Sequence, residues 1–192
     1  VIKQFPAGKY VGEASVPYAF VQNADTLLAF CHFELSSPDL DQSNSDQYNS
    51  FLNLYNLSKK TWVYVSRPIS GASRIPYVIN DRILFSAGRS IICHRLSTGE
   101  ELWKNNTFGQ DFTFSGLVIA EGKVIGNNED TYLYAVDLET GRTIWREKSN
   151  GTSRRLTYLD GVVYYAAGQV LHAVGVATGK HLWKLQSPDV AL

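Results

Sequence analysis

Methionine is absent from this chain, and cysteine occurs only twice, at Cys31 and Cys93. Because the chain begins at Val1 and holds no methionine, we expect that processing or truncation removed the start of the translation product. Two cysteines are too few for a disulfide-dense scaffold, and each lies inside a strand-like pattern. Their positions favour two buried thiols, with a disulfide between them as the lesser alternative.

An excess of either charge is also missing, because 18 Lys and Arg residues balance 18 Asp and Glu residues. Proteins that bind nucleic acid or a membrane surface through charge carry a basic patch or stripe. No apolar run approaches the roughly twenty residues that a helix needs to span a bilayer. The sequence therefore predicts no nucleic-acid partner and no membrane insertion.

Tryptophan is scarce but regularly placed. The four copies, Trp62, Trp103, Trp145 and Trp183, recur at one phase of a segment of about forty residues. Each of the last three follows a Thr-Gly pair, and the pairs are Thr98-Gly99, Thr140-Gly141 and Thr178-Gly179. A repeat of about forty residues rich in short strands is typical of a β-propeller, in which each blade is a four-stranded antiparallel sheet.

The best-formed copy shows why these residue types recur. The segment 132–138 is apolar on both faces, as expected for a strand that lies between two neighbouring sheets. Asp137 ends this strand, and its carboxylate can accept hydrogen bonds from turn amides ahead of it. Gly141 then supplies the positive φ that a tight hairpin needs. Trp145 offers a large apolar surface to the next blade while its N–H seeks a carbonyl.

Turn signals place four blades at about 16–65, 74–104, 112–147 and 153–185, within a single partial propeller domain that covers residues 1–192. Helix is nearly absent from this prediction, and the segment 36–47 is interpreted as a solvated loop. Propellers have four to eight blades, so four copies suggest a fragment of a larger one. Exposed strand edges favour pairing with another copy, and we expect the isolated chain to self-associate.

The segment from Ala135 to Trp145 resembles the pyrroloquinoline-quinone (PQQ) type repeat, whose pattern is A-x-D-x-x-T-G-x-x-x-W. The copies that end at Trp183 and Trp103 carry Gly175 and Arg95 at the Asp position. Aligned on Trp62, the first copy has no glycine, and its turn is about two residues shorter. The resemblance extends from about residue 16 to 186 and implies a quinoprotein-like β-propeller.

Three functions are compatible with this resemblance. The leading one is a non-catalytic scaffold, sensor or protein-interaction module, and the resemblance implies a periplasmic or cell-surface location. The second is a fragment of a PQQ-dependent dehydrogenase. Those enzymes hold the quinone against a disulfide of adjacent cysteines beside a calcium ion, and this chain has no adjacent cysteines. The third is binding of a carbohydrate or small ligand at the rim through Tyr48, Tyr55 or Tyr158. PQQ and calcium are expected as ligands only if the chain is a fragment of a PQQ-dependent dehydrogenase.

The sequence evidence for functional sites is weaker than the evidence for the repeat. The loop Asp39–Asp46 spaces its oxygen ligands as calcium loops do, but it lacks the glycine and the closing glutamate. Turn formation is favoured over cation binding at the hairpin tip Asn127–Asp130. The spacing of the histidines, His32, His94, His172 and His181, predicts no shared metal. No catalytic, cofactor-binding or metal-ligating residue is predicted.

Overall fold

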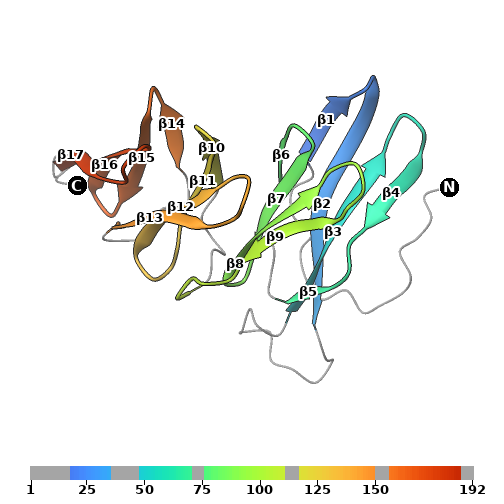
Figure 1. The fold of residues 1–192 in the computed structure, drawn as a ribbon, viewed down its shortest axis with the longest axis horizontal. Helices are drawn as coiled ribbons and strands as arrows, with labels where there is room; N and C mark the ends of the chain where they lie inside the picture. The colour runs from blue at the N-terminus through green and yellow to red at the C-terminus, as the bar shows by residue number, and fades with distance from the viewer. Residues whose placement is uncertain (1–17, 36–47, 71–75, 111–116, 150–155, 187–192) are drawn as a thin grey trace, which may run out of the picture. The chain divides into compact units, whose positions relative to one another are not determined.

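All regular structure in the described part of the chain is β-strand. The computed structural model describes residues 18–35, 48–70, 76–110, 117–149 and 156–186. Their strands form four sheets, numbered first to fourth in chain order (Figure 1). The all-β class and the four-stranded antiparallel sheets predicted from the sequence are confirmed.

Each sheet follows the chain order of its strands. The first sheet has the order β1 (Tyr18–Gln22), β2 (Asp25–Leu35), β3 (Tyr48–Asn56) and β4 (Thr61–Val65), with β5 (Ile69–Ser70) also pairing with β3. The second has β6 (Tyr77–Ile79), β7 (Arg82–Ala87), β8 (Ser90–Arg95) and β9 (Glu101–Asn105). The third has β10 (Leu117–Ala120), β11 (Lys123–Asn127), β12 (Tyr132–Asp137) and β13 (Thr143–Lys148). The fourth has β14 (Thr157–Leu159), β15 (Val162–Ala167), β16 (Val170–Gly175) and β17 (His181–Gln186).

One hydrogen bond recurs in every sheet. The residue after the third strand donates its backbone N–H to a carbonyl in or just after the turn that follows the first strand. The four bonds are Leu57 to Thr26 (2.8 Å), Leu96 to Asp81 (3.0 Å), Leu138 to Gly122 (2.9 Å) and Val176 to Gly161 (2.9 Å). Because the bond joins the two hairpins of a sheet at the same end, the turn after the third strand is held in a fixed place.

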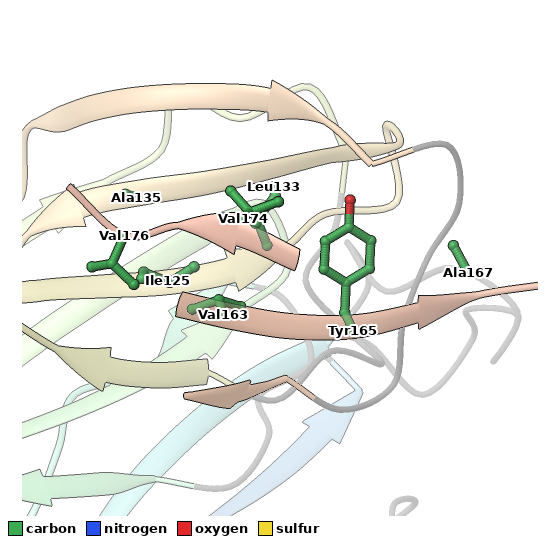
Figure 2. Packing of buried hydrophobic residues seen from close by; sticks show 8 residues of the cluster. All are labelled: Ile125, Leu133, Ala135, Val163, Tyr165, Ala167, Val174 and Val176. Atoms are coloured by element: carbon green, nitrogen blue, oxygen red, sulfur yellow. The ribbon is translucent and has the colours of Figure 1, made fainter. Parts of the chain in front are cut away.

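The chain divides into two compact units, residues 1–88 with 93–102, and residues 89–92 with 103–192. In the second unit the third and fourth sheets pack face to face. Ile125, Leu133 and Ala135 of the third sheet meet residues of the fourth, among them Val163 and Tyr165, and Figure 2 shows these side chains between the strands. All eight members of this cluster are at most 7% exposed. This burial explains the apolar face of β12 that carries Leu133 and Ala135, and Tyr134 and Val136 on its other face are buried as well.

The first unit has its own buried residues. Leu52, Leu54 and Phe85 are at most 1% exposed. Cys31 in β2 and Cys93 in β8 are fully buried and are not joined in a disulfide, which is the arrangement that the sequence favoured. Both therefore serve as small apolar side chains.

Candidate functional site

Trp145 of β13 lies against the turn that follows β16, directly over Gly179. A Cβ added to Gly179 would lie 2.6 Å from Cδ2 and 2.7 Å from Cε3 of the indole ring. The indole N–H donates a hydrogen bond of 2.9 Å to the carbonyl of Val176 in the same turn. Gly179 has a φ of +73°, so the turn needs glycine both for its backbone and for the space under the ring.

The same contact occurs once more in the second unit, between Trp103 and the turn that follows β12. A Cβ on Gly141 would lie 2.6 Å from Cδ2 and from Cε3 of the Trp103 ring. The indole N–H of Trp103 donates to the carbonyl of Leu138 at 3.0 Å. Asn105 adds a further hydrogen bond, from Nδ2 to the Gly141 carbonyl at 2.7 Å. The Thr-Gly turn is thus a receptor for an indole ring from another strand.

In the first unit a tyrosine makes this contact. A Cβ on Gly99 would lie 2.8 Å from Cγ of Tyr64. Tyr64 is paired with Leu54, and a register shift follows between Leu54 and Tyr55. In the third and fourth sheets the tryptophan occupies this same place, with Trp145 opposite Ala135, Trp183 opposite Ala173, and the shift following in each.

Tyr64, rather than Trp62, is therefore the first-sheet equivalent of the repeating tryptophan. Trp62 is paired with Tyr55, one register pair nearer the turn, and 37% of its surface is exposed. With Tyr64 as the anchor, the first turn has the same length as the others, so the shorter turn inferred from Trp62 is wrong.

Two further features support this alignment of the first turn. Lys60 stands at the glycine position with a φ of +55°. Asn56 stands at the position of Asp137, and its Oδ1 accepts the backbone N–H of Lys59 at 2.8 Å. Asp137 Oδ1 accepts the N–H of Thr140 in the same way at 2.7 Å.

The tyrosine does not reproduce the hydrogen bond of the indole. In the part of the chain that the structure describes, the buried hydroxyl of Tyr64 has no hydrogen-bond partner. Burial raises the pKa of this hydroxyl well above its usual range. An unpaired buried hydroxyl costs free energy, so the Tyr64 contact lacks the stabilisation that the indole hydrogen bond gives to the other two.

We expect Tyr64→Phe to leave the free energy of unfolding unchanged or to raise it by up to about 1–3 kcal/mol, because it removes an unsatisfied polar group. Urea denaturation of the two proteins gives the comparison. Tyr134→Phe is the matched control, since the Tyr134 hydroxyl donates to Asp130 Oδ2 at 2.6 Å. The control should lose stability by about 1 kcal/mol. A similar loss for Tyr64→Phe would show that its hydroxyl is hydrogen-bonded.

Asp137 organises its turn as its position in the pattern predicts. Its Oδ1 accepts the hydroxyl of Thr140 at 2.7 Å and the backbone N–H of Glu139 at 3.2 Å, besides that of Thr140. These hydrogen bonds, that of the Thr140 hydroxyl first, lower the pKa of the Asp137 carboxyl. In the second sheet Arg95 stands at this position, and Asp81 accepts the N–H and hydroxyl of Ser97 instead.

This lowered pKa predicts a pH dependence. The Asp137 carboxylate contributes stability above the unfolded-state pKa of about 3.9, and loses it as pH falls through the lower folded-state value. Asp137→Asn should therefore be less stable than the parent at pH 7, and the difference should shrink at pH 3. Chemical denaturation at both pH values measures this, with Glu100→Gln as the control for net charge. If the stability difference between Asp137→Asn and the parent were the same at pH 7 and pH 3, the ionised carboxylate would not stabilise the turn.

The fourth sheet has an apolar face that no described residue covers. Trp183 is 46% exposed, Leu185 is 61% exposed and Leu171 is 37% exposed. Leu171 and Leu185 are cross-strand partners, so these side chains lie on one face together with Trp183. The Trp183 ring contacts Tyr164 with 5.9 Å between ring centroids. We call this surface, formed by Tyr164, Leu171, Trp183 and Leu185, the open face.

The first unit has a groove with a mixed polar and apolar lining. It has a volume of about 280 Å³ and is lined by Phe20, Val21, Gln22, Val78, Asn80 and Leu96. Val21 is 73% exposed, more than the other large apolar side chains of the described residues. No sequence pattern marks this groove, because its lining comes from three separate segments of ordinary strand and turn residues.

The remaining candidates from the sequence are explained by local structure or lie outside the described residues. At the hairpin tip, Asn128 Nδ2 donates to the Gln110 carbonyl at 2.7 Å, and Asn128 Oδ1 accepts the Asp130 N–H at 3.0 Å. The acidic loop 39–46 and the side chain of Tyr48 lie outside the described residues. Tyr55 packs edge-on against Trp62, and the Tyr158 hydroxyl donates to Glu121 at 3.2 Å.

The histidines are dispersed. His32 stacks on Phe51, His94 meets the edge of Phe85, and His172 stacks on Tyr165 and approaches His181. Within the five described ranges, no group of three or more His, Cys, Asp or Glu residues is arranged to hold a metal. None of the described segments forms a helix long and apolar enough to cross a membrane.

A protein-family model matches most of this architecture. The PQQ_2 model, described as outer membrane protein assembly factor BamB, matches residues 55–191. No curated protein matches the chain.

Solved structures share the fold at low sequence identity. BamB from Moraxella catarrhalis is 14% identical, with a TM-score of 0.60 over 90% of this chain and 50% of that one. The designed protein Ika8 is 10% identical, with a TM-score of 0.60 over 91% of this chain and 62% of that one. The quinohemoprotein alcohol dehydrogenase ADHIIG from Pseudomonas putida HK5 is 15% identical, with a TM-score of 0.57 over 72% of this chain and 32% of that one. The chain therefore spans less than two thirds of each of these structures.

Proposed function

The chain belongs to the PQQ_2 family, whose model is described as outer membrane protein assembly factor BamB, and from this premise we propose that it is a protein-binding β-propeller of outer membrane protein assembly. The match over residues 55–191 is the observation that supports this role. In this proposal the chain is a non-catalytic scaffold that holds another polypeptide, and it works in the periplasm or at the cell surface.

The groove of the first unit is the proposed contact for the partner. Its lining is mixed, and Phe20, Val21, Val78 and Leu96 supply the apolar part, which suits the side chains of an extended polypeptide. Gln22 and Asn80 add amide groups that can pair with main-chain N–H and C=O groups of such a segment. The exposed Val21 would be covered by the partner, and burial of apolar surface would supply the driving force.

Depletion of the protein from its source cells tests the role. The expected result is a lower amount of folded outer membrane proteins, restored by the parent gene. The variant Val21→Asp should fail to restore it, because burying an unpaired carboxylate under the partner opposes binding. Val21→Thr has nearly the same shape without a charge, and it is the control for folding of β1.

The same cells distinguish the dehydrogenase alternative. Loss of a quinone-dependent alcohol oxidation, with folded outer membrane proteins unchanged, would contradict the proposal and favour an enzyme. If Val21→Asp restored the folded outer membrane proteins as well as the parent does, the groove would not be the contact for the partner.

A further inference from the structure

β4 is an edge strand of the first sheet. It pairs with β3 and with no other described strand. Ser66, directly after β4, donates its backbone N–H to the Leu52 carbonyl of β3 at 2.8 Å. Because backbone groups alternate between the two sides of a strand, the N–H and C=O of Val65 point away from β3. This side of β4 therefore presents main-chain groups with which a further extended segment can pair.

The last strands of the other three sheets, β9, β13 and β17, carry charge where β4 does not. The residue after the repeating ring is Lys104, Arg146 or Lys184 in these strands. Charged side chains on an edge strand oppose pairing with another chain. The first sheet has Val65 at this position, after Tyr64, and the whole strand Thr-Trp-Val-Tyr-Val holds no charged residue. β4 thus lacks a protection that the other three last strands have.

The composition of β4 also favours strand pairing. Its residues are β-branched or aromatic, and a short run of such residues without charge or proline pairs readily with other strands. Val63 is 41% exposed and Val65 is 51% exposed. A segment paired with β4 would cover part of this surface, so the burial of apolar area would add to the main-chain hydrogen bonds.

Positive charge lies at both ends of β4. Lys60 directly precedes the strand, and Arg67 follows it by two residues. Both residues are exposed, and neither makes an ion pair with any residue that the structure describes. The neighbouring Lys59, by contrast, is paired with Asp25 at 2.5 Å. A bound segment with acidic residues at both of its ends would therefore complement Lys60 and Arg67.

We propose that β4 binds an extended segment of another protein by strand pairing, and that this segment has apolar β-branched or aromatic residues between acidic ends. The groove at Val21 is a different surface, because its lining includes β1, which lies at the opposite edge of the same sheet. The inference therefore goes beyond the proposed function and does not rest on it.

A second copy of β4 is a poor partner. In an antiparallel pair that aligns the two copies along their whole length, Thr61 faces Val65 and Lys59 faces Arg67. In a parallel pair in register, Lys60 lies beside Lys60 and Arg67 beside Arg67. Like charges on paired strands are destabilising, so both arrangements are disfavoured. A segment with acidic ends has no such conflict.

Fluorescence anisotropy with the full-length polypeptide tests the inference. The probe is a labelled synthetic peptide, Val-Thr-Val-Thr-Val with Asp-Glu at each end. It should bind at least about 10-fold more tightly than the same peptide with Lys-Lys at each end. N-methylation of its five central amides removes the main-chain donors, and it should weaken binding by at least about 10-fold.

Reversal of the two end charges gives a matched pair of variants. Lys60→Glu combined with Arg67→Glu should reverse the preference, so that the peptide with lysine ends binds more tightly. Arg142→Glu combined with Lys180→Glu changes the net charge by the same amount at exposed positions of the second unit. This control should keep the preference for acidic ends.

Hydrogen exchange of the unsubstituted polypeptide locates the contact and needs no variant. Saturating peptide with acidic ends should slow the exchange of the Val65 amide, because pairing gives this outward N–H a hydrogen-bond acceptor. The exchange of the Val21 amide in β1 should not change. A parallel measurement without peptide, at rising protein concentration, tests a second copy as the partner.

Five results would overturn the inference. They are no binding of the acidic peptide at about 1 mM, equal binding of its N-methylated form, and an unchanged preference for acidic ends in the Lys60 and Arg67 double variant. The others are protection of the Val21 amide in place of the Val65 amide, and protection of Val65 by protein concentration alone. Val21→Asp should leave peptide binding at β4 unchanged, so this inference and the proposed function fail independently.

Discussion

We expect Trp145→Ala to lower the free energy of unfolding of the second unit by about 3–5 kcal/mol, the range typical of large aromatic truncations in a packed interior. The change removes the ring from Gly179 and leaves the Val176 carbonyl without its indole donor. It also takes away a side chain that packs against the cluster between the third and fourth sheets. Urea denaturation followed by circular dichroism measures the loss.

Trp183→Ala in the same 192-residue chain is the matched control. Like Trp145, Trp183 lies on the last strand of its sheet and is paired with an alanine, but 46% of its surface is exposed. Its replacement should cost clearly less than that of Trp145, because about half of its surface is exposed and its ring contact is with Tyr164 of the same sheet. Equal losses for the two variants would show that the open face is covered in the isolated chain. A loss below about 1 kcal/mol for Trp145→Ala would remove this ring from the contact between sheets.

The fold could be predicted from the sequence because the repeat has a local mechanism. Thr140-Gly141 and Thr178-Gly179 mark turns whose backbone needs glycine, and Asp137 marks the end of a strand. These requirements act over a few residues, so they are visible in the sequence. The alignment of the first copy on Trp62 was wrong because it relied on residue identity alone. Strand pairing sets the position in the sheet, and it places Tyr64 opposite Leu54.

A signal for the correct alignment was present in the first copy. Asn56 can accept a turn amide as Asp137 does, and it lies as far before Tyr64 as Asp137 lies before Trp145. An alignment on this capping residue instead of on the indole would have found the tyrosine. No sequence signal indicates the positive φ of Lys60, because lysine rarely adopts this conformation. The surrounding turn imposes it.

The open face and the groove at Val21 could not be predicted from sequence patterns. Leu171 and Leu133 belong to similar apolar strands, and only the presence or absence of a packed sheet separates 37% exposure from full burial. The groove gathers Phe20, Val78 and Leu96 from different strands and turns, each of which is unremarkable by itself. Periodicity identifies the faces of a strand, but it does not identify what lies against each face.

Gly179→Ala should destabilise the second unit more than its backbone conformation alone requires. A left-handed residue with a Cβ costs roughly 1–2 kcal/mol. The new Cβ would also lie 2.6 Å from the Trp145 ring, and displacing a packed ring adds about 1–3 kcal/mol. We therefore expect a total loss of about 2–5 kcal/mol in urea denaturation.

Gly168→Ala separates the two contributions, because Gly168 belongs to the same sheet and has a φ of +60°, but no atom lies within 4 Å of an added Cβ. It should show the backbone cost alone, about 1–2 kcal/mol. A double-mutant cycle then identifies the contact. In the Trp145→Ala background the ring is gone, so Gly179→Ala should cost no more than Gly168→Ala does. The cycle should therefore give a coupling energy of about 1–3 kcal/mol between Gly179 and Trp145. Additive losses in the cycle would mean that the glycine is required by the turn alone and that the ring does not constrain it.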